Sequence, residues 1–63
     1  MRYEIGDTVT LNSDYTYQNL AGETHTISKG TSGKVIAVFP TPIAYRIAFL
    51  EHGTVRLTEQ RLE

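Results

Sequence analysis

Apolar and polar residues alternate along several short segments of this chain, with the two-residue period of β-strands. No segment of ten residues carries apolar positions at helical spacing, and threonine, valine, isoleucine and tyrosine prevail wherever the pattern is regular. Glycine, proline, asparagine and serine separate the segments. The pattern predicts an all-β fold with five short strands, at residues 8–11, 33–39, 44–50, 54–57 and 61–63.

The best-defined pair of strands is joined by Glu51-His52-Gly53. Large apolar residues stand at odd positions on both sides, so like faces meet when residue 48 pairs with 56 and residue 50 with 54. This register predicts a three-residue loop with Gly53 in the left-handed conformation. A two-residue turn at His52-Gly53 would set Phe49 opposite Arg56, and we reject it for that reason.

Residues 12–29 form a connection too long for an unstructured loop in so small a domain. We expect it to form an irregular antiparallel hairpin, with β-prone arms at 15–17 and 24–27 and its tip at 19–22. Near the end, residues 58–60 predict a short 3₁₀ turn that is capped by Thr58 and delivers Leu62 into the core. With no repeat or linker in the sequence, we expect a single domain over residues 1–63.

Composition narrows the class of protein. A domain of 63 residues buries only about 60% of the surface that its unfolded chain exposes, so its stability is modest. It has no cysteine, which excludes disulfides and thiolate zinc sites and favours a cytoplasmic setting. No segment approaches the roughly 18 apolar residues of a membrane span. The formal charge of −1 provides no global basic field for phosphate backbones.

Turn glycines and apolar strand residues follow one another along nearly the whole chain: Gly6-Asp7-Thr8-Val9, Gly33-Lys34-Val35, Tyr45-Arg46-Ile47-Ala48-Phe49, Gly53-Thr54-Val55 and Leu62. This order resembles the SH3-like barrel superfamily, which implies a five-stranded, strongly bent barrel with a long first loop. It is similar to small bacterial barrels such as the carboxy-terminal domain of the nitrile hydratase β chain, an accessory protein of the photosystem and type II dihydrofolate reductase. The stretch at 33–35 is also similar to KOW and Tudor-like modules. Any such barrel needs these residues, so the resemblance specifies fold rather than activity.

The resemblance to type II dihydrofolate reductase does not extend to its active site. That enzyme carries Val-Gln-Ile-Tyr after its last hairpin, whereas this chain has Val55-Arg56-Leu57-Thr58. Elsewhere the acidic residues are dispersed among expected loops, the two histidines lack ligand spacing, and the serines stand in turn contexts. We therefore expect a protein that is not an enzyme, with no cofactor and no metal site.

The outer side of the best-defined hairpin is the first candidate binding site. In the register above, Arg46, Leu50 and Arg56 face outward, and the two arginines are diagonal neighbours about 7–8 Å apart. A guanidinium binds carboxylate or phosphate bidentately, and the leucine adds an apolar anchor. The competing interpretation is that the arginines are solvated, or pair with Glu51 or Glu59.

The tyrosines are the second candidate. Tyr15 and Tyr17, together with Tyr3, would form an exposed aromatic platform that stacks nucleobases or prolines, or would instead cover the open end of the barrel. In a chain with so few large residues, the covering role is the one we favour.

Three function hypotheses follow. The first is a non-enzymatic accessory module whose partner is another protein, because no catalytic set converges. The second is a nucleic-acid-binding module of the KOW or Tudor type, which requires Lys29, Lys34, Arg46 and Arg56 to lie on one side. The third is an enzyme assembled by homo-oligomerisation, as in the plasmid reductase.

Overall fold

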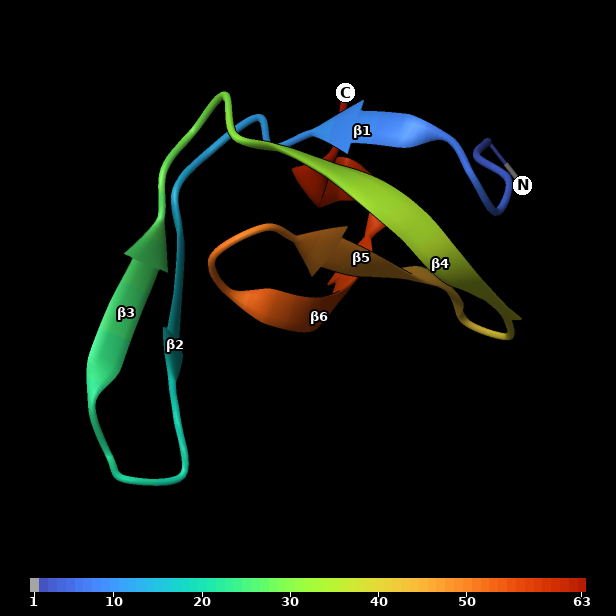
Figure 1. The fold of residues 1–63 in the computed structure, drawn as a ribbon. Helices are drawn as coiled ribbons and strands as arrows, with labels where there is room; N and C mark the ends of the chain where they lie inside the picture. The colour runs from blue at the N-terminus through green and yellow to red at the C-terminus, as the bar shows by residue number, and fades with distance from the viewer. Residues whose placement is uncertain (1) are drawn as a thin grey trace.

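A computed structural model describes residues 2–63 of the chain. Those residues form six β-strands and one short 3₁₀ turn, with no α-helix among them, which confirms the all-β prediction (Figure 1). The elements are β1 (Thr8–Thr10), β2 (Tyr15–Gln18), β3 (Thr24–Ile27), β4 (Ser32–Pro40), β5 (Ile43–Phe49), β6 (Gly53–Thr58) and the turn η1 (Glu59–Arg61). No helix within residues 2–63 is long and apolar enough to cross a membrane.

The main sheet is antiparallel and has the strand order β1-β4-β5-β6. After β6 the chain returns to β1, where Leu62 forms a bridge with Leu11. The backbones of Thr10 and Glu63 also exchange two hydrogen bonds, of 2.8 and 3.3 Å. The strand expected at 61–63 is therefore only one bridge, because η1 occupies the residues up to Arg61.

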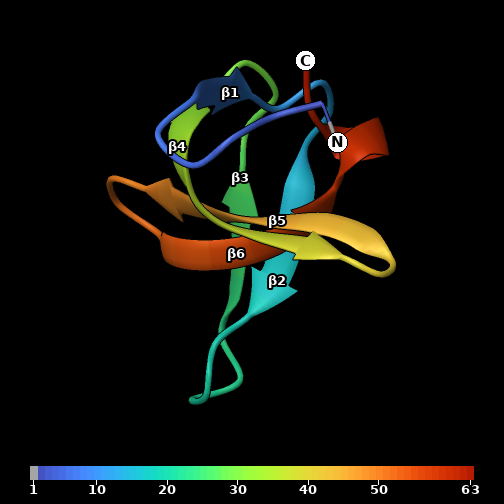
Figure 2. The same cartoon turned by 90° about the vertical axis from the view of Figure 1, so that its right-hand side faces the viewer.

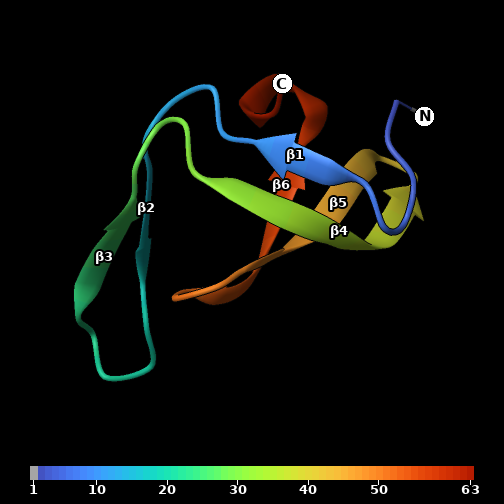
Figure 3. The same ribbon diagram turned by 45° about the horizontal axis from the view of Figure 1, so that its top comes forward.

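The count of five strands is wrong, because the long connection supplies two that the count left out. Its hairpin is confirmed: β2 and β3 pair with each other in a separate two-stranded ribbon, and the tip lies between Gln18 and Thr24. This ribbon points away from the main sheet (Figures 1 and 3). The short turn before the last bridge is also present, with Thr58 in the N-cap position, although its side chain makes no capping hydrogen bond.

The hairpin of β5 and β6 has a three-residue loop, as expected, but its register differs from the expected one by one pair. Phe49 pairs with Gly53 and Arg46 pairs with Arg56, so the loop is 50–52. Gly53 has a φ of 71°, which confirms the left-handed conformation, but it is the first residue of β6 rather than part of the loop. Like faces still meet, because the pairing moved by an even number of residues.

Strand β4 is long and strongly curved, passing from β1 to the hairpin of β5 and β6 (Figure 2). Its start packs tightly on β5: a Cβ atom at Gly33 would lie 2.6 Å from Cγ2 of Ile47 and 2.8 Å from the carbonyl oxygen of Ala48. Only glycine permits this close approach of the two backbones. Further along, the register shifts between Val35 and Ala37, which makes Ile36 the extra residue of a β-bulge.

The core lies between the main sheet and the base of the ribbon. Its buried side chains come from every strand except β2: Val9, Leu11, Ile27, Val35, Tyr45, Ile47, Phe49, Leu57 and Leu62. Tyr3, Tyr15 and Tyr17 are partly buried and pack against this cluster. The interpretation that the tyrosines cover the core is therefore supported over a free aromatic platform.

Candidate functional site

The side of β4, β5 and β6 that is turned away from the core is called the outer face here. Antiparallel partners point their side chains to the same side of a sheet, so the register assigns residues to it. Lys34 pairs with Ala48, and Ala48 pairs with Thr54. Two residues before Ala48 on β5, Arg46 pairs with Ala37 of β4 on one side and with Arg56 of β6 on the other. Three cationic side chains, Lys34, Arg46 and Arg56, thus share the outer face.

Arg46 and Arg56 lie directly opposite each other and close over one aromatic ring. The guanidinium carbon of Arg56 is 4.4 Å from the centroid of Phe39, and that of Arg46 is 5.4 Å from it. Phe39 itself pairs with Ala44, which is buried although it does not belong to the core cluster. We call Arg46, Phe39 and Arg56 the arginine platform. Within residues 2–63, neither of its arginines forms an ion pair with a carboxylate.

The bulge at Ile36 explains why Phe39 belongs to this site and why the sequence did not reveal it. Counting with a period of two from the buried Val35 would place Phe39 on the core side. The extra residue reverses the alternation, so Val38 packs against the core and Phe39 turns outward. A run of five consecutive apolar residues, from 35 to 39, contains no turn residue that would mark a bulge.

The outer face is basic because acidic residues are missing from the strands. The chain has seven Asp and Glu residues, and all seven lie outside the six strands: Glu4, Asp7, Asp14, Glu23, Glu51, Glu59 and Glu63. Half of the six Lys and Arg residues, in contrast, lie on the outer face. The net charge of −1 therefore does not reveal that three of the six cations are gathered on one face.

Two of the expected features of this site need correction. The arginines are direct neighbours rather than diagonal ones, because the loop starts one residue earlier than expected. Leu50 is fully exposed, but it lies in the loop and not on the strand. It lies four positions after Arg46, which corresponds to about 13 Å along an extended chain. Leu50 is therefore not part of the arginine platform.

Glu59, considered in the sequence analysis as a partner of the arginines, is engaged elsewhere. Its Oε1 accepts a hydrogen bond of 2.6 Å from the hydroxyl of Tyr45 and one of 3.0 Å from the backbone N–H of Arg2. Both bonds favour the ionised form, the Tyr45 bond more strongly, so the pKa of Glu59 lies below its usual value. The carboxylate anchors the N-terminal segment, so its hydrogen bonds are made there and not to the arginines.

The tyrosines of β2 belong to an aromatic cluster at the base of the ribbon. Tyr17 stacks on Tyr15 with centroids 6.4 Å apart and on His25 at 5.6 Å. Its hydroxyl lies 3.0 Å from Nδ1 of His52, which joins the ribbon to the loop between β5 and β6. Arg61 lies over the Tyr15 ring, 5.5 Å from its centroid. The two tyrosines thus pack on each other, on the core and on two histidines.

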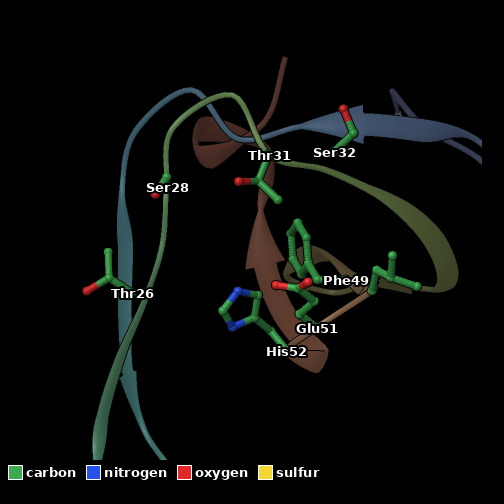
Figure 4. A pocket seen from close by; sticks show the side chains of 8 residues that line it. Thr26, Ser28, Thr31, Ser32, Phe49, Glu51 and His52 are labelled. Atoms are coloured by element: carbon green, nitrogen blue, oxygen red, sulfur yellow. The ribbon is translucent and has the colours of Figure 1, made fainter.

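A pocket of about 300 Å³ opens between the end of β3 and the loop between β5 and β6 (Figure 4). Hydroxyl side chains line one wall, and Glu51 and His52 stand on the other. Within residues 2–63, no group of three or more His, Cys, Asp or Glu side chains could hold a metal ion. The residues that line the pocket are Thr26, Ser28, Thr31, Ser32, Phe49, Leu50, Glu51 and His52.

Comparison with known proteins finds no matching family model and no significant match to a curated protein or a solved structure.

Proposed function

We propose that this chain is an SH3-like barrel that acts as a non-enzymatic docking module, and that its arginine platform binds an acidic segment of a partner protein. The observation that carries this proposal is the placement of Arg46 directly opposite Arg56, with Phe39 beneath them and no ion pair to a carboxylate within residues 2–63.

The barrel part of the proposal rests on the bend of the main sheet and on the position of the segment that follows β6. Strand β4 curves enough to pair with β1 at one end and with β5 along the rest of its length. The chain after β6 then returns to the other side of β1 through the bridge between Leu11 and Leu62. This return of the chain toward β1 supports a barrel, because a small barrel removes exposed edges by bringing its first and last segments together.

The docking part rests on an energetic argument. Like charges directly opposite on neighbouring strands destabilise a sheet. The cation-π contacts with Phe39 offset part of this cost, but at an exposed site they are each worth only about 0.5–1 kcal/mol. An acidic ligand would remove the repulsion, because each guanidinium can bind a carboxylate bidentately. The arrangement is thus better matched to the bound state than to the free one.

The chemistry favours an acidic protein segment over a nucleic acid. The outer face carries three cations, and the chain as a whole is slightly acidic, so the electrostatic attraction to a phosphate backbone is small. Lys29, the fourth cation of the nucleic-acid hypothesis, lies in the turn before β4, where its backbone N–H bonds to Asp14. The Phe39 ring is already in contact with two guanidiniums and is not free to stack on a base.

The test is a binding titration with a fluorescently labelled oligoglutamate peptide. Replacing both Arg46 and Arg56 with glutamine should weaken binding by about 1–3 kcal/mol, which is roughly 5- to 150-fold, while the exposed positions leave stability nearly unchanged. The matched control replaces Lys29 and Arg61 with glutamine, which changes the net charge equally but leaves the platform intact.

Equal losses of peptide affinity in both double variants would show general electrostatic attraction and would contradict the proposal. A labelled single-stranded oligonucleotide of the same charge forms the second arm of the titration. Tighter binding of the oligonucleotide, abolished by the platform variant, would favour the nucleic-acid hypothesis instead.

A further inference from the structure

The ribbon of β2 and β3 extends beyond the body of the molecule with little support. Its base is held by the buried Ile27 and by the two tyrosines, but the tip is in solvent, and Leu20 there is fully exposed. Figures 1 and 3 show the ribbon pointing away from the four-stranded sheet. A two-stranded hairpin is marginally stable in water, whereas three or more strands are stable together. The ribbon therefore gains from any strand added to it.

The hydrogen-bonding pattern shows which backbone groups would receive such a strand. Next to the tip, the N–H of Asn19 donates to the carbonyl of Glu23, so this pair is hydrogen-bonded. Hydrogen-bonded and non-bonded pairs alternate along an antiparallel ladder. The pairs at Thr24 and Thr26 are then of the non-bonded kind, and both residues direct their N–H and C=O groups away from β2.

Apart from its short length of four residues, this outward edge of β3 lacks the features that normally protect an edge. Natural sheets protect their edges with charged residues, proline or bulges. Neither β2 nor β3 contains a charged residue or a proline, and their pairing is regular over all four positions. The pocket of about 300 Å³ lies beside Thr26 and Ser28, and the loop between β5 and β6 forms its opposite wall (Figure 4).

We infer that the edge of β3 pairs with the same edge of a second copy of this chain, antiparallel and about a two-fold axis that passes beside His25. In this register Thr24 of each copy lies opposite Thr26 of the other. All outward N–H and C=O groups of these two residues are then bonded, which makes four hydrogen bonds across the axis. The two ribbons become one four-stranded sheet.

A second copy suits this edge better than an unrelated strand. The edge carries no Asp, Glu, Lys or Arg, so no permanently charged side chain of β3 repels a second copy there. Its outward residues are both threonines, and threonine pairs favourably with threonine across strands. The same kind of contact already exists inside the ribbon, where the hydroxyls of Thr16 and Thr26 lie 3.3 Å apart. The inference is independent of the proposed function, because the arginine platform lies on the main sheet.

The experiment measures molecular mass by sedimentation equilibrium over a wide range of protein concentration. We expect the wild-type mass to rise from the 7.1 kDa of one chain toward twice that value. Thr26→Pro removes an outward N–H that the ribbon does not use, so it should leave the fold intact and keep the chain monomeric. Thr26→Lys provides a second variant that blocks the edge without a proline.

The matched control is Thr16→Pro, which makes the same change at the free edge of β2, where the pairing pattern also directs the N–H outward. The control should still dimerise. A wild-type chain that stays at 7.1 kDa at every concentration would overturn the inference and leave the edge for a strand of another protein. Loss of dimer in Thr16→Pro but not in the two Thr26 variants would overturn it as well, because the other edge would then be the interface.

Discussion

Replacing Gly33 with alanine tests whether the close approach of β4 and β5 determines the shape of the sheet. The added methyl group would lie 2.6 Å from Cγ2 of Ile47, 2.8 Å from the carbonyl oxygen of Ala48 and 3.0 Å from Cδ1 of Phe49. Carbon atoms in comfortable contact are about 3.5–4.0 Å apart, so the two strands must separate by several tenths of an ångström. Two of the three neighbours are core side chains and the third is backbone, so none can move alone.

The expected effect follows from two opposing terms. Overpacking of a well-packed site costs about 1–3 kcal/mol. Replacing glycine with alanine also restricts the unfolded chain, which returns about 0.4–1 kcal/mol. We therefore expect Gly33→Ala to lower the free energy of unfolding by about 1–2 kcal/mol, which is about 4–15 °C in the melting temperature of a domain of this size.

The assay is thermal and denaturant unfolding followed by circular dichroism. Ser32→Ala is the control, since Ser32 directly precedes Gly33 and its side chain is exposed. A second variant combines Gly33→Ala with Ile47→Leu, which removes the Cγ2 atom but keeps the side-chain volume. Rescue should be partial, because the carbonyl oxygen of Ala48 stays in place. An unchanged melting temperature in Gly33→Ala would refute the reasoning. Full recovery of the melting temperature in the double variant would refute the role given to the carbonyl oxygen of Ala48.

Two further predictions concern stability. Gly53→Val should destabilise the fold by more than about 1 kcal/mol, since Gly53 has a φ of 71° that a β-branched residue avoids. Gly53→Asn should lose less stability, because asparagine tolerates a positive φ. Equal melting temperatures for the two variants would contradict this prediction. Because the pKa of Glu59 is lowered in the folded state, its carboxylate stabilises the fold above the pKa that it has in the unfolded chain, and this contribution is lost as the pH falls through the folded-state pKa. The difference in melting temperature between wild type and Glu59→Gln should thus be largest near neutral pH and shrink in acid; a difference that is the same at every pH would show that Glu59 acts through its shape alone.

The strand pattern of the sequence was sufficient for the fold class and for most elements, because a period of two reports which side of a strand is buried. The same signal cannot distinguish registers that differ by an even number of residues, since both bring like faces together. This is why the hairpin of β5 and β6 could be expected with its left-handed Gly53, while the direct pairing of Arg46 with Arg56 could not.

The candidate site was predicted in part for a related reason. The outward direction of Arg46 and Arg56 follows from strand parity, which the register change preserved. Phe39 was hidden because a bulge reverses parity, and the apolar run around Ile36 does not mark it. Leu50 was misplaced because a leucine at the end of a strand pattern does not show where the loop begins. The absence of acids from strands, in contrast, was visible once the strands were known.

The separation of charge between strands and connections has a kinetic consequence. Three of the six cations share one face of the main sheet and all seven carboxylates lie in the connections, so charge is unevenly distributed although the net charge is only −1. If the outer face binds an acidic partner as proposed, the three cations would steer that partner toward this face during a diffusional encounter. The rate of association would then fall as salt is added, because the Debye length shrinks from about 30 Å at 0.01 M to about 10 Å at 0.1 M. The rate of dissociation, set by contacts already made, would change much less.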